Sequence, residues 1–567
     1  MQEMDPAYEQ SEAFEADTPP SISARTLKRL LYLVLGALAV LLLVLIPPLI
    51  SLNRYQKRIA NSISDSLGRP VHLDEVNLNL LPLPGFTLQN FVVDEDPAFG
   101  SEPVIRSASV RATLRMSSLL RHRIEFSTIS FSEPTSVNLV HLANGKWNLE
   151  SILLHAAHVE AAPTAQAKAG PTPRFPYIEA TGARLNLKFD HEKTPISLTD
   201  ADFALWLPDP QEWHVRIQAH PARTDTNVSD TGVVQVEGTL GRAVSLDQVP
   251  LNLRGVWRNV PLGQASLVLF GRDAGLRGDM ALSANAQGTV SSSIIQTRLE
   301  LVGARRADFV PTQPIDVDMQ CLATATAEFR SFEDVHCSWP PTGSSDPPTL
   351  AISGALPDVR NLRTAAIEIG TPALPAATLL DWLRVASSRV PADIAASGTV
   401  TGTLSYHPEQ ADSTPWQGVM RVTDAGLINP RAGTASLITG DVTLQSISTP
   451  APDSHRKKHL PQPPTFNGFQ LAPTFLVLGG KDPATLDGHF DTAGYTVHLA
   501  GMASLARLNA LAAALPFLGD GLDEVLPTNR AAGPFRVDLT GTRSWGQDQT
   551  WIDNTARVVA PHPKHAR

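Results

Sequence analysis

Apolar and polar residues alternate along much of this 567-residue chain, and this pattern limits the possible folds more than any other feature. In one run, from Val76 to Leu80, valine and leucine alternate with asparagine. Successive side chains of a β-strand point to opposite faces, so such a run predicts a strand with one apolar and one polar face. The chain also contains 46 prolines and 37 glycines, which favour turns between short elements. The sequence therefore predicts a mainly β fold with a few short helices, built as one long antiparallel sheet or as several stacked ones.

Further strands and helices follow from the same periodicities. Val110 to Met116 alternates like a strand, and the apolar runs Ile124 to Phe131 and Val137 to Leu142 predict two more strands. The second half contains a repeated pattern in which a leucine-rich helix precedes a glycine-led strand. The helical leucines of the two copies are Leu379, Leu380 and Leu383, then Leu505, Leu508, Leu511 and Leu515. The repeat indicates a body extended by duplication.

One segment near the N-terminus is long, apolar and free of charge. It covers 17 residues from Leu30 to Ile46, and apolar residues continue to Leu52 beyond two prolines. A helix needs about 20 such residues to cross the hydrocarbon core of a bilayer. A cleaved signal peptide is the alternative, but residues 51–58 offer no small-residue cleavage site. We therefore expect a membrane anchor over residues 28–52, with the leucines Leu30, Leu33, Leu35, Leu38, Leu41, Leu43 and Leu45 facing lipid.

The charges beside this segment give little information on its orientation. Three basic residues precede it within residues 25–29, and three follow it within residues 54–58, so the positive-inside rule hardly favours one orientation over the other. Residues 1–27 begin with an acidic, polar stretch that predicts a disordered tail. A short tail inside and a long domain outside is the usual arrangement for one N-terminal anchor. We expect the N-terminus in the cytoplasm and the bulk of the chain outside it.

Short motifs follow the apolar segment in a defined order. A helix is predicted over residues 55–67, since Tyr55, Ile59, Ile63 and Leu67 recur every four residues. After it come Gly-Arg-Pro at 68–70, Leu-Pro-Leu-Pro-Gly at 81–85, Ser-Leu-Leu at 118–120, Glu-Pro at 133–134 and Gly-Lys-Trp-Asn-Leu at 145–149. In this order the motifs resemble the N-terminal region of the AsmA family, best over residues 28–155.

The resemblance implies a location and a broad role. AsmA family proteins lie in the inner membrane of Gram-negative bacteria and carry periplasmic β-rich bodies. They are linked to outer-membrane biogenesis and phospholipid movement, and are related to chorein-like bridge proteins with lipid-lining β-grooves. For this chain the resemblance implies a curved sheet in the periplasm and, as partners, membrane phospholipids and envelope-assembly proteins.

Composition divides the chain into eight predicted parts. A proline- and alanine-rich linker and a proline-rich basic loop separate the β-rich stretches. The parts are the tail 1–27, the anchor 28–52, an AsmA-like α+β domain 53–155, the linker 156–175, a β-rich body 176–448, the loop 449–464, a C-terminal β/helix repeat 465–545 and a polar tail 546–567.

No motif of a known active site occurs in the chain. There is no Gly-x-Ser-x-Gly, Walker, Rossmann or His-Glu-x-x-His pattern, so we expect neither an enzyme, nor a cofactor, nor a metal site. A net charge of -10 gives no electrostatic basis for binding nucleic acid. The two cysteines, Cys321 and Cys337, are either a local disulfide or a pair of reduced, buried thiols.

The one-sided strands provide the main functional hypothesis. If the sheet curves into an open groove, its apolar face can hold acyl chains; if apolar faces pack together, they form a sandwich core. Periodicity does not separate these alternatives. Candidate lipid-facing residues are Leu185, Leu187, Phe189, Val215, Ile217, Leu251 and Leu253. We expect an envelope protein that binds or helps to move phospholipid and supports outer-membrane biogenesis; the alternative is a non-enzymatic scaffold for outer-membrane protein assembly without lipid in a groove.

Overall fold

The structure is a computed structural model, and it describes most of the chain between residues 24 and 553. The described residues are 24–45, 56–79, 83–119, 126–152, 176–190, 192–209, 212–243, 245–342, 349–359, 361–387, 390–408, 415–430, 433–448, 467–491, 493–515, 534–544 and 551–553. The predicted N-terminal tail, linker 156–175, loop 449–464 and most of the C-terminal tail therefore lie outside the described residues.

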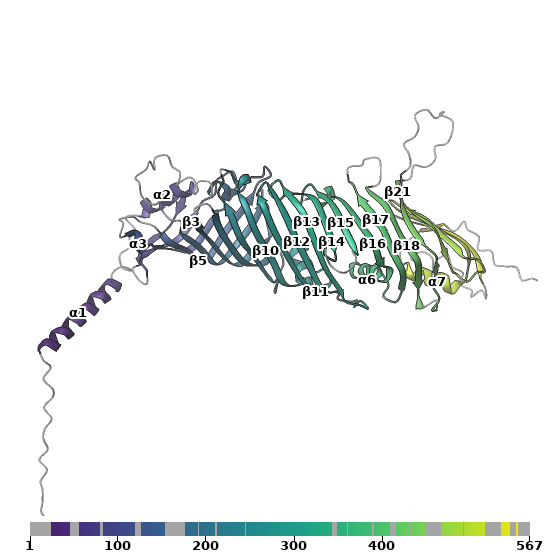
Figure 1. Cartoon of the computed structure of the whole chain (residues 1–567), viewed down its shortest axis with the longest axis horizontal. Helices are drawn as coiled ribbons and strands as arrows, with labels where there is room; N and C mark the ends of the chain where they lie inside the picture. Colours follow the sequence, from purple (N-terminus) through teal and green to yellow (C-terminus); the bar gives the residue numbers. More distant parts are fainter. Residues whose placement is uncertain are drawn as a thin grey trace, which may run out of the picture.

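All described strands belong to a single 25-stranded sheet, which forms the elongated body in Figure 1. From the N-terminal end, its first strands are β1 (Val71–His72), β2 (Glu75–Asn79), β3 (Gly85–Val93), β4 (Ile105–Leu114), β5 (Phe126–His141), β6 (Tyr177–Phe189), β7 (Glu192–Asp209), β8 (Glu212–Arg223) and β9 (Val233–Gly241). The central strands are β10 (Pro250–Pro261), β11 (Leu276–Thr289), β12 (Ser292–Arg306), β13 (Ile315–Thr326), β14 (Ser331–Trp339), β15 (Leu350–Leu356), β16 (Ala366–Pro375), β17 (Ala395–Tyr406) and β18 (Trp416–Ile428). The last are β19 (Ile438–Thr439), β20 (Val442–Ser448), β21 (Asn467–Leu476), β22 (Ala484–Phe490), β23 (Gly494–Ala503), β24 (Phe535–Ser544) and β25 (Trp551–Asp553).

The strands follow each other through the sheet in nearly the order of the chain. From β6 to β18 each strand pairs antiparallel with the next, and β20 to β25 continue the same pattern. One pair departs from the predicted antiparallel arrangement, because β5 and β6 run parallel. At about 4.8 Å per strand, such a sheet extends for roughly 100 Å. No boundary between the predicted β-rich body and the C-terminal repeat interrupts it, since β20 pairs directly with β21.

The predicted helices are confirmed, and two strand predictions need correction. The helices are α1 (Ala24–Leu45), α2 (Gln56–Leu67), α3 (Met116–Leu119), α5 (Leu262–Phe270), α6 (Ala376–Ala386) and α7 (Leu505–Ala514). The strand expected to reach Met116 ends at Leu114. The two strands expected on either side of Pro134 form one strand, β5. The pairing of β5 with β6 changes register between Phe131 and Ser136, and a proline is tolerated at such an irregularity.

The expected membrane anchor lies partly within the described residues. The helix α1 projects from one end of the body in Figure 1. Its leucines from Leu30 to Leu41 are all at least half exposed, whereas Leu43, Leu45 and residues 46–52 lie outside the described side chains. Among the described residues, no helix has both the length and the apolar character that a membrane span requires.

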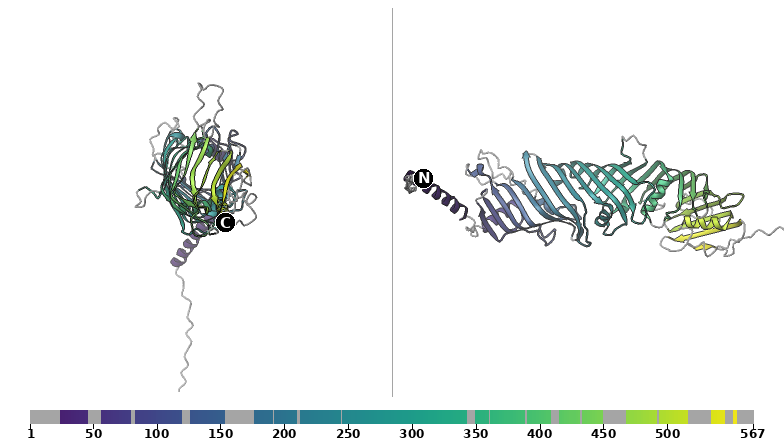
Figure 2. Two further views of the ribbon diagram at one scale, coloured as in Figure 1. Left: turned by 90° about the vertical axis from the view of Figure 1, so that its right-hand side faces the viewer. Right: turned by 90° about the horizontal axis from the view of Figure 1, so that it is seen from below.

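The sheet curls about its long axis. Viewed along that axis in Figure 2, the strands wrap around the centre of the body. A contact between His141, at the end of β5, and Glu328, in the turn between β13 and β14, also requires this curl. These strands are far apart in the order of the sheet, so a flat sheet would keep the two residues apart.

Candidate functional site

One face of the curled sheet is apolar from strand to strand. Direct cross-strand partners share a face, so the register shows which residues line it. Trp257 of β10 is opposite Leu282 of β11, Leu282 is opposite Leu299 of β12, and Leu299 is opposite Met319 of β13. We call the inward residues of β9 to β16 the central apolar face: Val234, Val236, Leu253, Trp257, Leu282, Ala286, Ile295, Leu299, Met319, Ala323, Ile352 and Ile369.

The residues of the central apolar face are only half-buried. Side chains of a closed sandwich core would be buried, as they are in clusters at the two ends of this sheet. The described strands, moreover, form one sheet and not two stacked ones. The centre of the sheet therefore presents apolar side chains that no other described element fully covers.

The opposite face of the same strands carries the charged side chains, together with a few exposed apolar ones such as Ile294 and Leu322. Arg298 of β12 alternates with the inward residues Thr297 and Leu299 and forms a salt bridge of 2.7 Å with Asp318 of β13. A shallow depression of about 310 Å³ lies on this outer face, bordered by the stacked rings of Trp206 and His214. The sheet thus separates an apolar inside from a charged outside, as the alternation predicts.

Helices cover the two ends of the apolar face. At the N-terminal end, Ile59 and Ile63 of α2 pack against buried residues of β1 to β4, including Val76 and Leu88. At the C-terminal end, Leu508 and Leu511 of α7 are buried against β21 to β24. These are the amphipathic helices that the leucine and isoleucine spacing predicts, and each buries its apolar face on the sheet.

The structure contains a disulfide between the two cysteines, and not a pair of reduced thiols. Cys321 of β13 and Cys337 of β14 are direct cross-strand partners, and their sulfurs are bonded. Cys337 is also opposite Ile352 of β15. The disulfide therefore lies on the apolar face and adds another apolar group to its surface.

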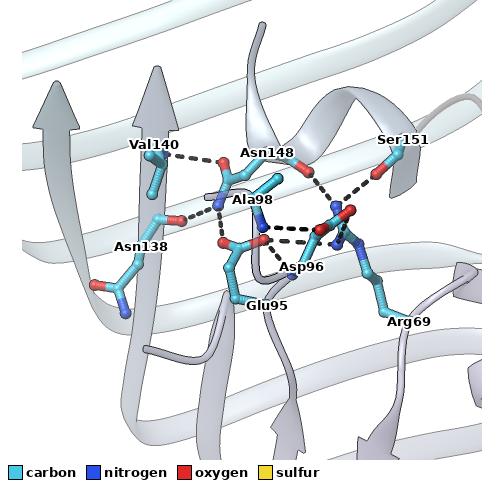
Figure 3. A network of polar contacts seen from close by, with 8 residues as sticks. All are labelled: Arg69, Glu95, Asp96, Ala98, Asn138, Val140, Asn148 and Ser151. Atoms are coloured by element: carbon cyan, nitrogen blue, oxygen red, sulfur yellow. Dashed lines mark hydrogen bonds and ion pairs between the residues drawn. The ribbon is translucent and has the colours of Figure 1, made fainter. Parts of the chain in front are cut away.

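Two motifs of the N-terminal region meet in a buried polar network (Figure 3). The amide nitrogen of Asn148 donates to the Glu95 carboxylate over 2.6 Å and to the carbonyl of Asn138 over 2.8 Å. Arg69 lies 3.3 Å from the Asp96 carboxylate and donates to Ser151 Oγ over 2.7 Å. Asn148 is fully buried, and its amide oxygen accepts from the β5 backbone over 3.0 Å.

This network explains why the Gly-Arg-Pro and Gly-Lys-Trp-Asn-Leu motifs occur together. Arg69 follows α2, and Asn148 follows β5, so their contacts fix the helix and the strand in one arrangement. Burial raises the pKa of Glu95, while the hydrogen bond from Asn148 and the charge of Arg69 oppose the shift. Sequence reasoning identified both motifs but not their contact, because they are far apart in the chain.

A second buried contact joins distant strands. His141 Nε2 lies 3.9 Å from Glu328 Oε2, and the imidazole of His141 stacks on Trp147 with ring centres 4.6 Å apart. Glu328 is in a turn of three consecutive left-handed residues, Ala327 to Phe329, a conformation that is costly for residues other than glycine. Burial, and then the negative charges of Glu150 and Asp247, raise the pKa of Glu328.

The residues predicted to face lipid have different surroundings. Val215 and Leu251 are buried, and Ile217 and Leu253 are half-buried on the same face, since Val215 and Leu253 both flank Gly238. The three predicted residues of β6 lie elsewhere: Leu185 packs against the buried alanines of β6 to β8, Leu187 is half-buried, and Phe189 is exposed beside His141.

Comparison with known proteins gives one match. A model of the AsmA family matches residues 26–189, which include α1, α2 and the network around Asn148. Neither a curated protein nor a solved structure matches the chain significantly. The matched segment is less than a third of the 567 residues, but it contains both motifs that the structure brings together. The N-terminal segment of the chain, residues 26–189, is therefore similar to the AsmA family.

Proposed function

We propose that this protein is a membrane-anchored component of the bacterial envelope that binds phospholipid acyl chains on its central apolar face. The half-buried state of that face is the observation that carries the proposal. A soluble body gains no stability from leaving so many apolar side chains accessible to water, and a contiguous apolar surface of this kind usually marks a binding surface.

The chemistry of the face fits an acyl chain better than a polar substrate. Its surface consists of aliphatic and aromatic groups, together with the disulfide. Each methylene removed from water contributes about 0.8 kcal/mol, so ten methylenes contribute about 8 kcal/mol relative to water. Relative to a bilayer the gain is close to zero, because the chain is already in hydrocarbon. Such a balance allows lipid to enter and leave, as movement of lipid requires.

The helix α1 and the match to the AsmA family model support the proposed location. The helix presents leucine and valine side chains that are exposed over residues 30–41, and the sequence remains apolar to Ile46. We propose that this helix anchors the chain in the inner membrane, with the N-terminus in the cytoplasm and the sheet in the periplasm. The match to the AsmA family model supports a role in the envelope, in outer-membrane biogenesis. The proposed activity is binding and transfer, without catalysis.

Two adjacent residues of β15 give a matched test of the proposal. Ile352 points to the apolar face, where it is opposite Cys337, and Ser353 points to the polar face, where it is opposite His336. The full-length protein is purified in mild detergent, and bound phospholipid is quantified by mass spectrometry after extraction. We expect Ile352→Asp to lower bound lipid several-fold and Ser353→Asp to leave it unchanged. Circular dichroism verifies that both variants are folded.

The result also separates this function from its alternative. Equal lipid content in wild type and both variants would show that the lipid surrounds only α1. That result would favour a scaffold for outer-membrane protein assembly, which needs the surfaces of the sheet but no lipid on its apolar face.

A further inference from the structure

We infer that opposite rims of the curled sheet are joined by a latch, whose opening admits acyl chains to the central apolar face from the side. The latch consists of residues 141–147, at and after the end of β5, and of the turn from Ala327 to Phe329, between β13 and β14. The inference rests on the proposed function and specifies how lipid reaches the face.

The two halves of the latch come from opposite rims of the sheet. His141 ends β5 and is opposite Phe189, the last residue of the parallel strand β6. From β6 to β13 each strand runs against the one before it, so the turn after β13 lies at the other rim. The contact between His141 and Glu328 therefore shows that β6 to β13 wrap far enough for the two rims to meet.

The half of the latch that follows β5 is held firmly in place. The His141 side chain is only 8% exposed, and its ring stacks on Trp147 and lies 6.1 Å from the ring centre of Phe189. The backbone at Gly145 also approaches the opposite rim, since a Cβ at this position would lie 3.9 Å from Glu328 Oε2. The surface that receives Glu328 is thus preformed.

The other half of the latch carries two features that weaken the closed state. All three residues of the turn are left-handed, a conformation that is unfavourable for residues with a side chain. His141 Nε2 and Glu328 Oε2 are 3.9 Å apart, which is too far for a hydrogen bond. Strain of this kind persists only while the surrounding contacts hold it, so the turn is the half that moves when the latch opens.

Charges around Glu328 make the latch weaker at high pH. Burial, and then the negative charges of Glu150 and Asp247, raise the pKa of Glu328, while the charge of Arg330 opposes the shift. His141 is the remaining titratable group beside the carboxyl. Because the folded pKa is raised, the neutral carboxyl stabilises the closed latch at low pH, and this stabilisation is lost as the pH rises through the folded pKa.

The position of the latch gives it control over a route from the side. Trp257 lies on β10, which stands between β6 and β13 in the sheet. An acyl chain that approaches this part of the central apolar face from the side has to pass between the two joined rims. Opening of the latch therefore sets the rate at which lipid arrives, and not the amount that the face holds.

Glu328→Gln tests the inference, because the amide keeps this side chain neutral at every pH. Full-length protein in phosphatidylcholine vesicles is mixed with vesicles of phosphatidylcholine brominated in its acyl chains. The quenching of Trp257 is followed as the difference from the same protein carrying Trp257→Phe. We expect Glu328→Gln to be quenched several-fold more slowly than wild type at pH 8, at nearly the wild-type rate at pH 5, and to the same final extent.

Two further variants complete the test. Glu333→Gln is the matched control, since it neutralises an exposed carboxyl of β14 outside the latch, and should leave the rate unchanged. His141→Ala removes the other side of the contact and should be quenched faster than wild type, which gives a second test if Glu328→Gln does not fold. Hydrogen exchange of residues 142–147 and 327–330 verifies that the latch is tighter in the first variant and looser in the last.

The possible outcomes distinguish this inference from the function on which it rests. Equal quenching rates in wild type, Glu328→Gln and His141→Ala would overturn the latch but keep the lipid-binding function. A slower rate of Glu328→Gln that is the same at pH 5 and pH 8 would also overturn it, because the wild-type carboxyl is closer to neutral at pH 5. If Trp257 of the wild type is never quenched, the proposed function itself is wrong.

Discussion

At the scale of single residues, the clearest constraint is the buried network around Asn148. Its side chain satisfies a carboxylate, a carbonyl and a backbone amide in one place. A buried polar group that loses its partner costs about 1–3 kcal/mol. The network therefore helps to hold α2 on the end of the sheet through Arg69, which follows the helix and contacts Asn148 and Ser151.

We predict that Asn148→Ala lowers the stability of the N-terminal end by about 2–3 kcal/mol, because it removes the buried hydrogen bonds to Glu95 and to the Asn138 carbonyl and the one from the Val140 amide. Ser151→Ala is the control, since it removes one hydrogen bond to Arg69, and should cost about 1 kcal/mol. Hydrogen exchange of α2 and residues 142–150 measures both effects. Equal protection in the two variants would contradict the assigned role of Asn148.

The turn containing Glu328 is predicted to respond to pH. The pKa of Glu328 is raised in the folded protein, so the neutral carboxyl stabilises the folded turn. This stabilisation is fully present below the ordinary pKa near 4.5 and is lost as the pH rises through the folded pKa. Hydrogen exchange of residues 327–330 should therefore accelerate as the pH rises from 4.5 to 8, after correction for intrinsic rates.

Glu328→Gln provides the control for this pH response. The amide stays neutral, so the variant should lose the pH dependence of local protection while Glu95, whose pKa is also raised, remains unchanged. If the turn of the variant retains the wild-type pH dependence, another group is responsible.

At the scale of elements, the strands and helices could largely be predicted from the sequence. Strict alternation identified β2, β8 and β10, and leucine spacing identified α6 and α7. The single long strand β5 was missed because Pro134 interrupts its pattern, and only the register with β6 shows that the strand continues through it. Period-two patterns predict strands, but not which strands are neighbours.

The helix α6 gives a prediction at this scale. Trp382→Ala should remove packing against the apolar face and against Trp339, at a cost of about 2–3 kcal/mol, since the side chain is only half-buried. Hydrogen exchange of α6 measures this loss. Leu383→Ala is the control, because Leu383 is 48% exposed, and should leave the protection of α6 nearly unchanged.

At the scale of the whole molecule, the candidate site could be predicted only in part. Alternation predicted an apolar face, and four of the seven candidate residues lie in β8 and β10 on that face. Which parts of this face are covered could not be predicted, because the cover depends on where α2, α6 and α7 pack after the sheet curls. Burial depends on such distant contacts, which local periodicity does not record.

The extended sheet predicts that unfolding is not a single transition. The cluster around α2 and the cluster around α7 share no residue and lie at opposite ends of the sheet. When each segment contacts only its neighbours, stability is close to a sum of local terms. We expect at least two transitions in urea, monitored by hydrogen exchange at each end; one transition with equal midpoints at both ends would contradict this expectation.

The central claim is that acyl chains contact the inward face of β9 to β16. Trp257 tests this claim most directly, because it is an intrinsic fluorophore on that face. Full-length protein is loaded with phospholipid brominated in its acyl chains, and fluorescence quenching is compared between wild type and Trp257→Phe. The account predicts that the fluorescence difference between wild type and Trp257→Phe is much smaller with brominated lipid than with unbrominated lipid, because the bromine quenches Trp257. If this difference is the same with both lipids, no acyl chain lies on the central apolar face.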